Sequence, residues 1–323
     1  MDVTIVCHTE FGRVVSREIA YTKNAIDGVS VGVPNLIKLA DKYSAKVTFA
    51  VMPEVAEHFP RDMKHEIGLH VHPGWTEYDK LGEHWCIGDA YLRDHCKQSI
   101  NSLGLRNYTY DEQLGMIKAG KDHIEDFFGV EPRSFVSGLW SINNDTIKAL
   151  IKAGFAYDCS TLLRSRPSVY DWSELNRICL PYHPHEDNYQ KHGNLPLLIV
   201  PTSQMLLREN VNPEVVPILG LGWLKACFKE YYRQKAPLFN ICLHSPCMSD
   251  PYFLKNMDSL LSFISKHEVN FKFISEVGDY PDHAVKTSLI PYVLGINREM
   301  MRTFVEKKIL PRRNIPWNTN PSH

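Results

Sequence analysis

Short runs of β-branched and apolar residues alternate with longer amphipathic stretches along most of the chain, and this alternation limits the fold more than any other feature. Such continuously apolar strands are typical of a parallel sheet that helices cover on its outer face. We predict an α/β fold, a single closed or nearly closed (β/α) barrel of seven or eight units over residues 1–290. Its strands are expected at residues 3–7, 46–51, 66–71, 134–137, 155–160, 197–200, 238–243 and 270–274, and its helices at 33–40, 111–128, 144–153, 220–234 and 250–266.

The charge balance of the chain is close to neutral. Lysines and arginines number 36 and acidic residues 37, which gives a formal net charge of −1. A nucleic-acid-binding domain carries a basic excess, so we expect no nucleic-acid partner. The longest uncharged apolar stretch, residues 215–224, is ten residues long, whereas a membrane-spanning helix needs about 20. An acidic residue stands at position 2, where a secretory signal has its basic start, so we predict a cytoplasmic protein.

The cysteines agree with that compartment. The chain has eight, and no two of them are spaced as in a CxxC zinc or redox motif. Several lie inside apolar runs, so we expect buried free thiols that pack as small hydrophobic side chains. They are Cys7, Cys86, Cys96, Cys159, Cys179, Cys227, Cys242 and Cys247.

Residues 291–323 differ in composition from the rest. This segment carries six arginines and lysines against two glutamates, with apolar residues placed between them. The pattern predicts a basic amphipathic tail. Two locations stay open for it: it packs on the barrel, or it makes weak contact with an anionic membrane surface.

Polar, reactive residues follow the predicted strands instead of preceding them. His8 and Glu10 follow the first strand, His70 and His72 end the third, and His244 follows the strand at 238–243. In a parallel barrel the carboxyl ends of the strands meet at one rim, which is where chemistry collects. We therefore expect these side chains to converge there, together with Asp158 from the strand at 155–160.

His70 and His72 are spaced as neighbours on one side of a strand. Two imidazoles in this position can bind one metal ion, and Glu10 is the candidate third ligand. Such a set leaves a coordination position open for water. We predict a divalent cation, with Zn²⁺ favoured and Ni²⁺, Co²⁺ or Fe²⁺ as alternatives. The other interpretation is that these histidines are hydrogen-bonded rim residues.

Two further histidines are candidates for proton transfer. His8 has no evident packing reason to lie beside Glu10, so it is a candidate general base or a fourth ligand. His244 is a candidate general acid that protonates a leaving amine. A second His-x-His pair, His183 and His185, stands in a proline-containing loop and is expected to be solvated.

Several of these segments resemble the polysaccharide deacetylases of the NodB-homology type (carbohydrate esterase family 4). The likeness spans residues 3–275 and is closest to a divergent WbmS-like branch found with O-antigen clusters. The segments that carry it are 46–51 (KVTFAV), 66–72 (EIGLHVH), 132–160 (PRSFVSGLWSINNDTIKALIKAGFAYDCS), 197–202 (LLIVPT) and 243–244 (LH).

The resemblance implies a distorted (β/α) barrel with a divalent metal held by Glu10, His70 and His72. In the family the metal activates the water that attacks an N-acetyl carbonyl, a carboxylate in the first motif acts as base, and the last histidine acts as acid. That last histidine corresponds to His244. The implied activity is metal-dependent removal of an acyl (acetyl) group from an N-acylated sugar in surface polysaccharide or O-antigen biosynthesis. The implied partner is a free N-acylated sugar, a nucleotide sugar or a lipid-linked glycan. Aromatic side chains that could stack on a sugar ring are Trp75, Trp140, Tyr157 and Tyr182.

Three departures from the family pattern keep a second hypothesis open. His8 stands at the position of the family's catalytic aspartate, and the histidine pair is spaced HxH where HxxxH is common. Val136 and Leu139 occupy positions where the branch has arginines, and Arg133 is the nearby candidate replacement. The alternative is therefore a catalytically altered or inactive NodB-fold module that binds a carbohydrate or a partner. A metal hydrolase of the amidohydrolase kind is disfavoured, because its HxH follows the first strand.

Overall fold

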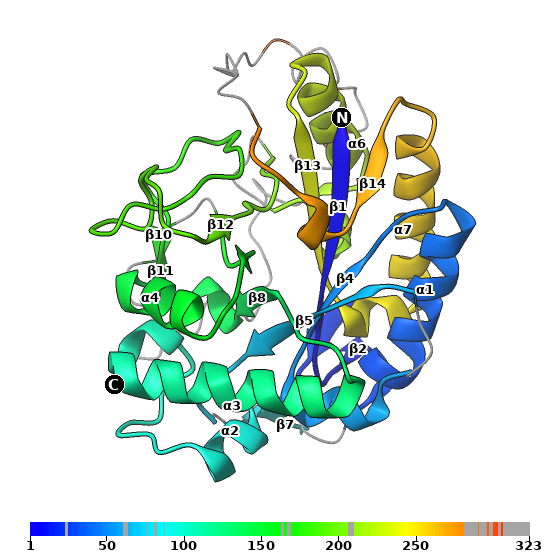
Figure 1. Ribbon diagram of the computed structural model, residues 1–323. Coiled ribbons are helices and arrows are strands. Elements are labelled where there is room, and N and C mark those ends of the chain that lie inside the picture. Colours follow the sequence, from blue (N-terminus) through cyan, green and yellow to red (C-terminus); the bar gives the residue numbers. More distant parts are fainter. Residues whose placement is uncertain are drawn as a thin grey trace.

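The computed structural model describes residues 1–22, 25–60, 64–75, 77–80, 83–86, 88–162, 165–166, 169–205 and 210–280, with positions 290, 296, 300–302 and 305. A curled parallel sheet forms its centre (Figure 1). In spatial order its strands are β12 (Leu198–Ile199), β9 (Tyr157–Asp158), β8 (Ser134–Ser137), β5 (Glu66–Val71), β4 (Thr48–Val51), β1 (Asp2–Thr9) and β13 (Leu238–His244). The predicted fold, a distorted (β/α) barrel, is confirmed.

The sheet closes irregularly between β12 and β13. The Ser203 N–H donates to the Asn240 carbonyl of β13 at 3.0 Å, and the Cys242 N–H donates to the Val211 carbonyl at 3.1 Å. A coil segment thus takes the place of a further strand on this side. On the side of β1 that faces away from β13, two strands pair with different parts of β1. Strand β14 (Asn270–Lys272) pairs with residues Asp2–Thr4 at its amino end, and β4 pairs with Val6–Thr9 at its carboxyl end.

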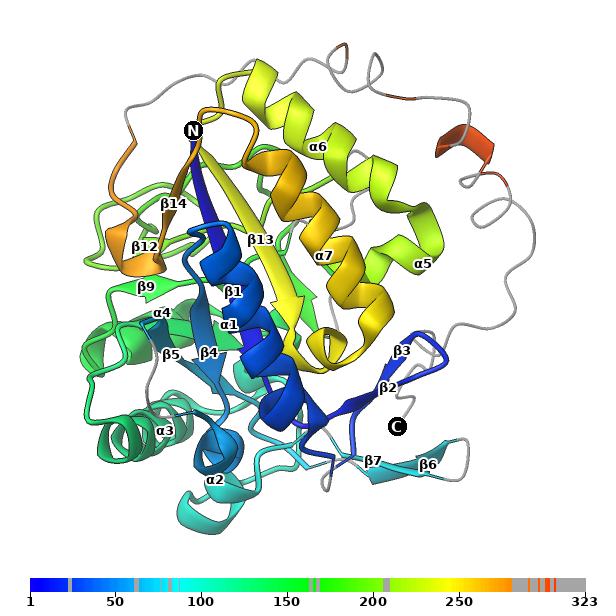
Figure 2. The ribbon, with the colours of Figure 1, turned by 90° about the vertical axis from the view of Figure 1, so that its right-hand side faces the viewer.

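Helices surround the outer face of the sheet. Figure 2 shows α1 (Val33–Lys42), α7 (Pro251–Ile264) and α6 (Leu221–Arg233) side by side. The helices α3 (Tyr110–Phe128) and α4 (Asn144–Lys152) pack together and cover the sheet further round. The shorter helices are η1 (Gly28–Gly32), η2 (Pro53–His58), α2 (Ala90–His95), η3 (Leu105–Asn107), η4 (Gly138–Trp140), η5 (Pro213–Val215), α5 (Val216–Leu219), η6 (Ser245–Ser249) and η7 (Ile274–Glu276).

The long helices begin and end at local sequence signals. Thr109 caps α3 in a capping box with Glu112, and the helix ends at Gly129, whose φ of 67° suits a residue without a Cβ atom. Asn143 caps α4, and Asp250 followed by Pro251 starts α7. These signals explain why the predicted helix bounds agree with the observed ones to within about two residues.

The core has two parts, one on each face of the sheet. The larger lies between strands and helices and contains Phe49, Leu69 and Phe239. The smaller lies inside the barrel and includes Val6, Ala50 and Val136. Because side chains alternate along a strand, the inner row of β1 runs from Val6 to His8 and on towards Glu10. The apolar interior therefore leads directly to the polar rim.

Some predicted elements differ from the observed ones. The strands expected at residues 155–160 and 197–200 shorten to the two-residue β9 and β12, because their outer ends bend into loops. Three hairpins were not predicted: β2 (Arg13–Val15) with β3 (Glu18–Ala20), β6 (Glu77–Lys80) with β7 (Glu83–Cys86), and β10 (Ser165–Arg166) with β11 (Tyr170–Asp171). The seven cysteines whose side chains are described are all free, as expected, but only five of them are buried, since Cys96 and Cys179 are partly exposed.

Most of the predicted tail, residues 291–323, lies outside the described residues. At one described position, Met300 is buried and its carbonyl accepts a hydrogen bond from Trp223 Nε1 of α6 at 3.3 Å. The amphipathic character of the tail and its membrane contact stay predictions. Among the described residues, no helix combines the length and the apolar character that crossing a bilayer requires.

Candidate functional site

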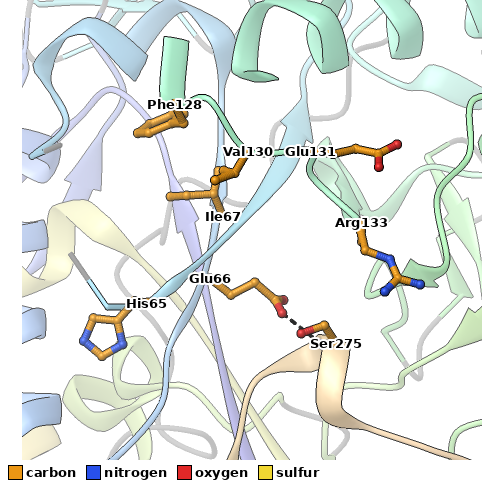
Figure 3. Close-up of a pocket in the computed structure, with 8 residues that line it drawn as sticks. All are labelled: His65, Glu66, Ile67, Phe128, Val130, Glu131, Arg133 and Ser275. Carbon is orange, nitrogen blue, oxygen red and sulfur yellow. Dashed lines mark hydrogen bonds between the residues drawn. The ribbon is translucent and has the colours of Figure 1, made fainter. Parts of the chain in front are cut away.

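The two ends of the barrel differ in their chemistry. At the amino ends of β5 and β8 lies a cavity of about 300 Å³, lined by His65, Glu66, Ile67, Phe128, Val130, Glu131, Arg133 and Ser275 (Figure 3). His70 and His72 lie at the opposite, carboxyl end of β5. Arg133 precedes β8 and therefore lies at the amino end of the barrel, too far from the histidines to replace the missing arginines. The suggestion that it does so is wrong.

Three strands that are distant in sequence bring the predicted site residues to the carboxyl end. β1 supplies His8 and leads into Glu10, β5 supplies His70 and leads into His72, and β13 ends at His244. His8 and His244 are direct partners in the parallel pairing of β1 with β13. All five side chains are buried, and the most exposed residue, His244, is 8% exposed. The expected convergence of these residues is what the structure shows.

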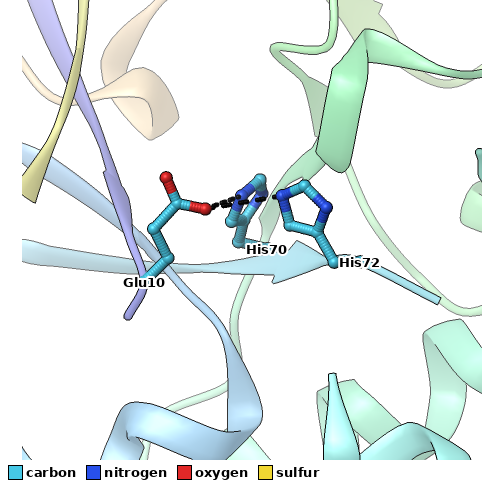
Figure 4. Close-up of side chains that lie close together, drawn as sticks. All are labelled: Glu10, His70 and His72. Atoms are coloured by element: carbon cyan, nitrogen blue, oxygen red, sulfur yellow. Dashed lines mark ion pairs between the residues drawn. The ribbon is translucent and has the colours of Figure 1, made fainter. Parts of the chain in front are cut away.

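Glu10, His70 and His72 form the closest group (Figure 4). Glu10 Oε2 lies 3.7 Å from His70 Nε2 and 3.4 Å from His72 Nε2. One potential ligand atom from each residue lies within 4.8 Å of the other two, close enough to share one ion. Within the described part of the chain, this is the only group of three histidine, cysteine or acidic side chains with that property.

The hydrogen bonds of His70 suit a metal ligand. Its Nδ1 lies 3.0 Å from the Val136 carbonyl, which can only accept, so Nδ1 carries the proton. His70 Nε2 therefore holds a free lone pair, and it has no hydrogen-bond partner among the described residues. Burial lowers the pKa of His70, which keeps the ring neutral. Two imidazoles and a carboxylate are donors that Zn²⁺ and similar divalent ions accept, so the residues fit such a group.

Glu10 is ionised despite its burial. Burial alone raises its pKa, but the nearby His244, His70 and His72 outweigh that effect and hold the pKa well below its usual value. Its backbone N–H donates to the Ser245 hydroxyl at 3.3 Å, which joins the ends of β1 and β13. A buried carboxylate with few partners of its own is suited to bind a cation.

His8 lies between the other rings. Its centroid is 4.9 Å from that of His70 and 4.7 Å from that of His244. His8 Nε2 lies 3.4 Å from the Cys242 sulfur. Burial, with His244 and His70 nearby, lowers the pKa of His8 well below its usual value, so the ring is neutral. A neutral imidazole can accept a proton on the ring nitrogen that carries no hydrogen, and this nitrogen is Nδ1 in the tautomer in which Nε2 donates to the Cys242 sulfur.

His244 is paired with a residue that the sequence did not single out. His244 Nδ1 lies 2.8 Å from Glu214 Oε1, and the backbone N–H of His244 donates to the same oxygen at 2.9 Å. Burial lowers the pKa of His244, but Glu214 and Glu10 together raise it to about 9. Its Nε2 lies 3.7 Å from Glu10 Oε1, so the protonated ring faces the carboxylate. Glu214 follows Asn212 and Pro213 at a helix start, a pattern that carries no catalytic signal.

The turn after β8 packs against His72. Gly138 approaches so closely that an added Cβ atom would lie 2.3 Å from His72 Nδ1. The next two residues, Leu139 and Trp140, have φ values of 56° and 52°, a region that side chains rarely adopt. Val136, on the inner side of β8, is 1% exposed, so an apolar side chain stands where an arginine was expected from the family branch.

The structure does not bring the remaining candidates to this site. His183 Nδ1 bonds the Leu195 and Leu197 carbonyls, and His185 Nδ1 accepts the Asp187 N–H. Asp158 is buried, and its described hydrogen bonds are with Ser160, not with the histidines. Its expected place in the reactive group is therefore wrong.

Comparisons with known proteins define the class of fold. A Pseudomonas aeruginosa PAO1 protein assigned to the polysaccharide deacetylases aligns with a TM-score of 0.55 at 17% identity, over 85% of this chain and 88% of that one. A Mycobacterium smegmatis protein with the same assignment aligns with a TM-score of 0.53 at 16% identity, over 84% of this chain and 88% of that one. The Puue allantoinase aligns with a TM-score of 0.54 at 17% identity, over 85% of this chain and 88% of that one. The chain has the NodB-type (β/α) barrel of these proteins.

A sequence relative agrees with the fold. The peptidoglycan deacetylase of Helicobacter pylori is 22% identical over 276 residues, which cover 77% of this chain and 83% of that protein. No family model matches the chain. The resemblance to NodB-type polysaccharide deacetylases, expected from the motifs, is confirmed by these relatives.

Proposed function

We propose that this protein is a metal-dependent hydrolase that removes an acetyl group from an N-acylated sugar. The observation that carries the proposal is the group formed by Glu10, His70 and His72. The His70 ring makes its hydrogen bond through Nδ1, so the lone pair of Nε2 remains free to bind a metal ion. The fold and the Helicobacter pylori relative support a deacetylase. A divalent ion bound by the three side chains would supply a Lewis acid that polarises the acyl carbonyl and activates water.

The roles of the protein's own residues follow from their contacts. His8, held neutral by burial, is the proposed base that takes a proton from the attacking water, in the tautomer in which Nε2 donates to Cys242. His244, charged and held at Nδ1 by Glu214, is the proposed acid and donates from Nε2 to the leaving nitrogen. Water adds to the carbonyl carbon, the C–N bond breaks, and the products are acetate and a free amine.

The substrate we propose is a precursor in surface polysaccharide or O-antigen biosynthesis. In the cytoplasm, the acetamido sugar would be carried as a nucleotide sugar or a lipid-linked glycan. Val136 is buried and uncharged, which supports a substrate whose group next to the histidines is neutral.

Acetate release tests the activity. Purified protein is treated with a chelator, supplied in turn with Zn²⁺, Ni²⁺, Co²⁺ or Fe²⁺, and incubated with N,N′-diacetylchitobiose or UDP-N-acetylglucosamine. Acetate is expected with at least one ion and none after chelation. Sugar binding without acetate under every condition would favour the second candidate, a non-catalytic module. That candidate is supported by His8 at the position where the family has an aspartate.

A further inference from the structure

Two aromatic side chains lie at the proposed reaction centre, and one of them, Tyr21, has its ring centred 6.4 Å from that of His244 and its hydroxyl next to Glu10, whereas the other is Trp140. The Trp140 ring is centred 6.0 Å from that of His8 and 6.3 Å from that of His244. The other aromatic candidates have different partners. Tyr157 donates to the Ser275 carbonyl, Tyr182 donates to the Tyr189 carbonyl, and the Trp75 ring lies under Arg93.

The indole N–H of Trp140 lacks a partner. The Nε1 atom is buried and makes no hydrogen bond within the described part of the chain. A buried donor left unpaired costs about 1–3 kcal/mol, and native structures contain few of them. The carbonyl of the same residue accepts from Trp172 Nε1 at 3.2 Å, so the surrounding backbone is held in place while the ring N–H is not used.

The backbone that presents this ring is strained. Leu139 and Trp140 are consecutive left-handed residues that are not glycine, at φ 56° and 52°. Such conformations persist only where the surrounding structure enforces them, and they cluster at binding and catalytic sites. Gly138, two residues before Trp140, packs directly against the ring of His72. The position of Trp140 therefore depends on the position of a proposed metal ligand.

We propose that Trp140 is a substrate-binding residue whose indole N–H donates a hydrogen bond to a hydroxyl oxygen of the acetamido sugar. This inference rests on the proposed function. His244 is placed to protonate the leaving nitrogen, and the sugar is bonded to that nitrogen. The Trp140 ring lies close to both proposed proton-transfer residues, so a sugar bonded to that nitrogen comes within reach of its N–H. An indole N–H can only donate, which suits a neutral hydroxyl.

Indole NMR tests the proposal without relying on turnover. The chain has six tryptophans, so a ¹⁵N-labelled, Zn²⁺-loaded sample gives up to six indole signals, and Trp140→Phe identifies one of them by its loss. That signal is expected to shift when N,N′-diacetylchitobiose or UDP-N-acetylglucosamine is added. Trp140→Phe keeps an aromatic ring but removes the donor, so sugar affinity should fall about three- to tenfold with metal content unchanged. Trp223→Phe is the matched control and should bind as the wild type does, because Trp223 lies on α6 and its Nε1 donates to the Met300 carbonyl.

The outcomes separate this inference from the proposed function. A shifted Trp140 signal without acetate release supports the inference and contradicts the hydrolase. Acetate release with an unmoved Trp140 signal, and with an unchanged KM in Trp140→Phe, overturns the inference alone. No shift of that signal at saturating concentrations of either sugar also overturns it.

Discussion

Glu214 Oε1 accepts two hydrogen bonds from His244, one from the backbone N–H at 2.9 Å and one from Nδ1 at 2.8 Å. This double contact fixes the rotamer of the ring and keeps a hydrogen on Nδ1. It leaves Nε2 as the nitrogen that faces Glu10. Glu214 is thus a positioning residue that acts through His244.

The first prediction concerns this pair. Glu214→Gln keeps the shape of the side chain but removes its charge, so the pKa of His244 should fall and the ring should lose its acidic proton near neutral pH. We expect kcat for acetate release to fall about 10²-fold, within the range that general acid catalysis contributes. KM and metal content should stay close to those of the wild type. Glu57→Gln, at an exposed side chain, is the control. Loss of metal in Glu214→Gln would show a structural role instead.

The second prediction concerns the metal ligands. Glu10→Gln and His72→Ala should each lower the bound divalent metal, measured by elemental analysis, from about one equivalent to a small fraction. Each removes one of three donors. His185→Ala removes a histidine from the other His-x-His pair and should keep its metal, because His185 lies in a loop away from the site. Equal metal content in all of these variants would contradict the assignment.

The third prediction compares two glycines. Gly138→Ala places a methyl group 2.3 Å from His72 Nδ1, so the ring must move and metal affinity should fall at least tenfold while the protein stays folded. Gly115 is exposed in α3, and an added Cβ would meet no atom within 4 Å. Gly115→Ala should therefore raise the free energy of unfolding by about 0.5–1 kcal/mol and leave the metal bound. Titration with a metal-binding dye and denaturant unfolding measure the two effects.

The fourth prediction concerns pH and stability. Burial raises the pKa of Asp158 to about 7 in the folded protein, against 3.8 when unfolded. Between these values the folded state holds a proton that the unfolded chain has lost, so the free energy of unfolding falls as the pH rises from 4 through 7. Asp158→Asn cannot ionise and should show a weaker fall across that range in denaturant unfolding. Asp145→Asn, at a half-exposed side chain, should keep the wild-type slope. A slope that steepens in Asp158→Asn would refute this assignment.

Local patterns explain how much of the fold could be predicted. β5 was predicted at its observed bounds because the apolar Ile67, Leu69 and Val71 recur at every second position. α3 was expected at residues 111–128 because Gly129 marks its end, and the capping residue Thr109 is seen in the structure. The same patterns predicted the positions of Glu10, His70 and His72, since period-two spacing and strand ends are local features.

Contacts between distant segments could not be predicted in this way. Glu214 meets His244 across 30 residues, and nothing in its own segment distinguishes it from a surface glutamate. The sulfur of Cys242 meets His8 across 234 residues. Arg133 is close to the site in sequence but lies at the far end of the barrel, because strand direction decides which rim a residue occupies.

The three proposed ligands come from β1 and β5, which are separated by β4 and share no backbone hydrogen bond. An ion bound by all three side chains would link these two strands at the carboxyl end of the barrel. A ligand that binds only the folded state adds about 2.7 kcal/mol of stability at one hundred times its dissociation constant. The melting temperature should therefore rise with the free concentration of the preferred ion, so heat resistance becomes a way to rank ions before any substrate is known.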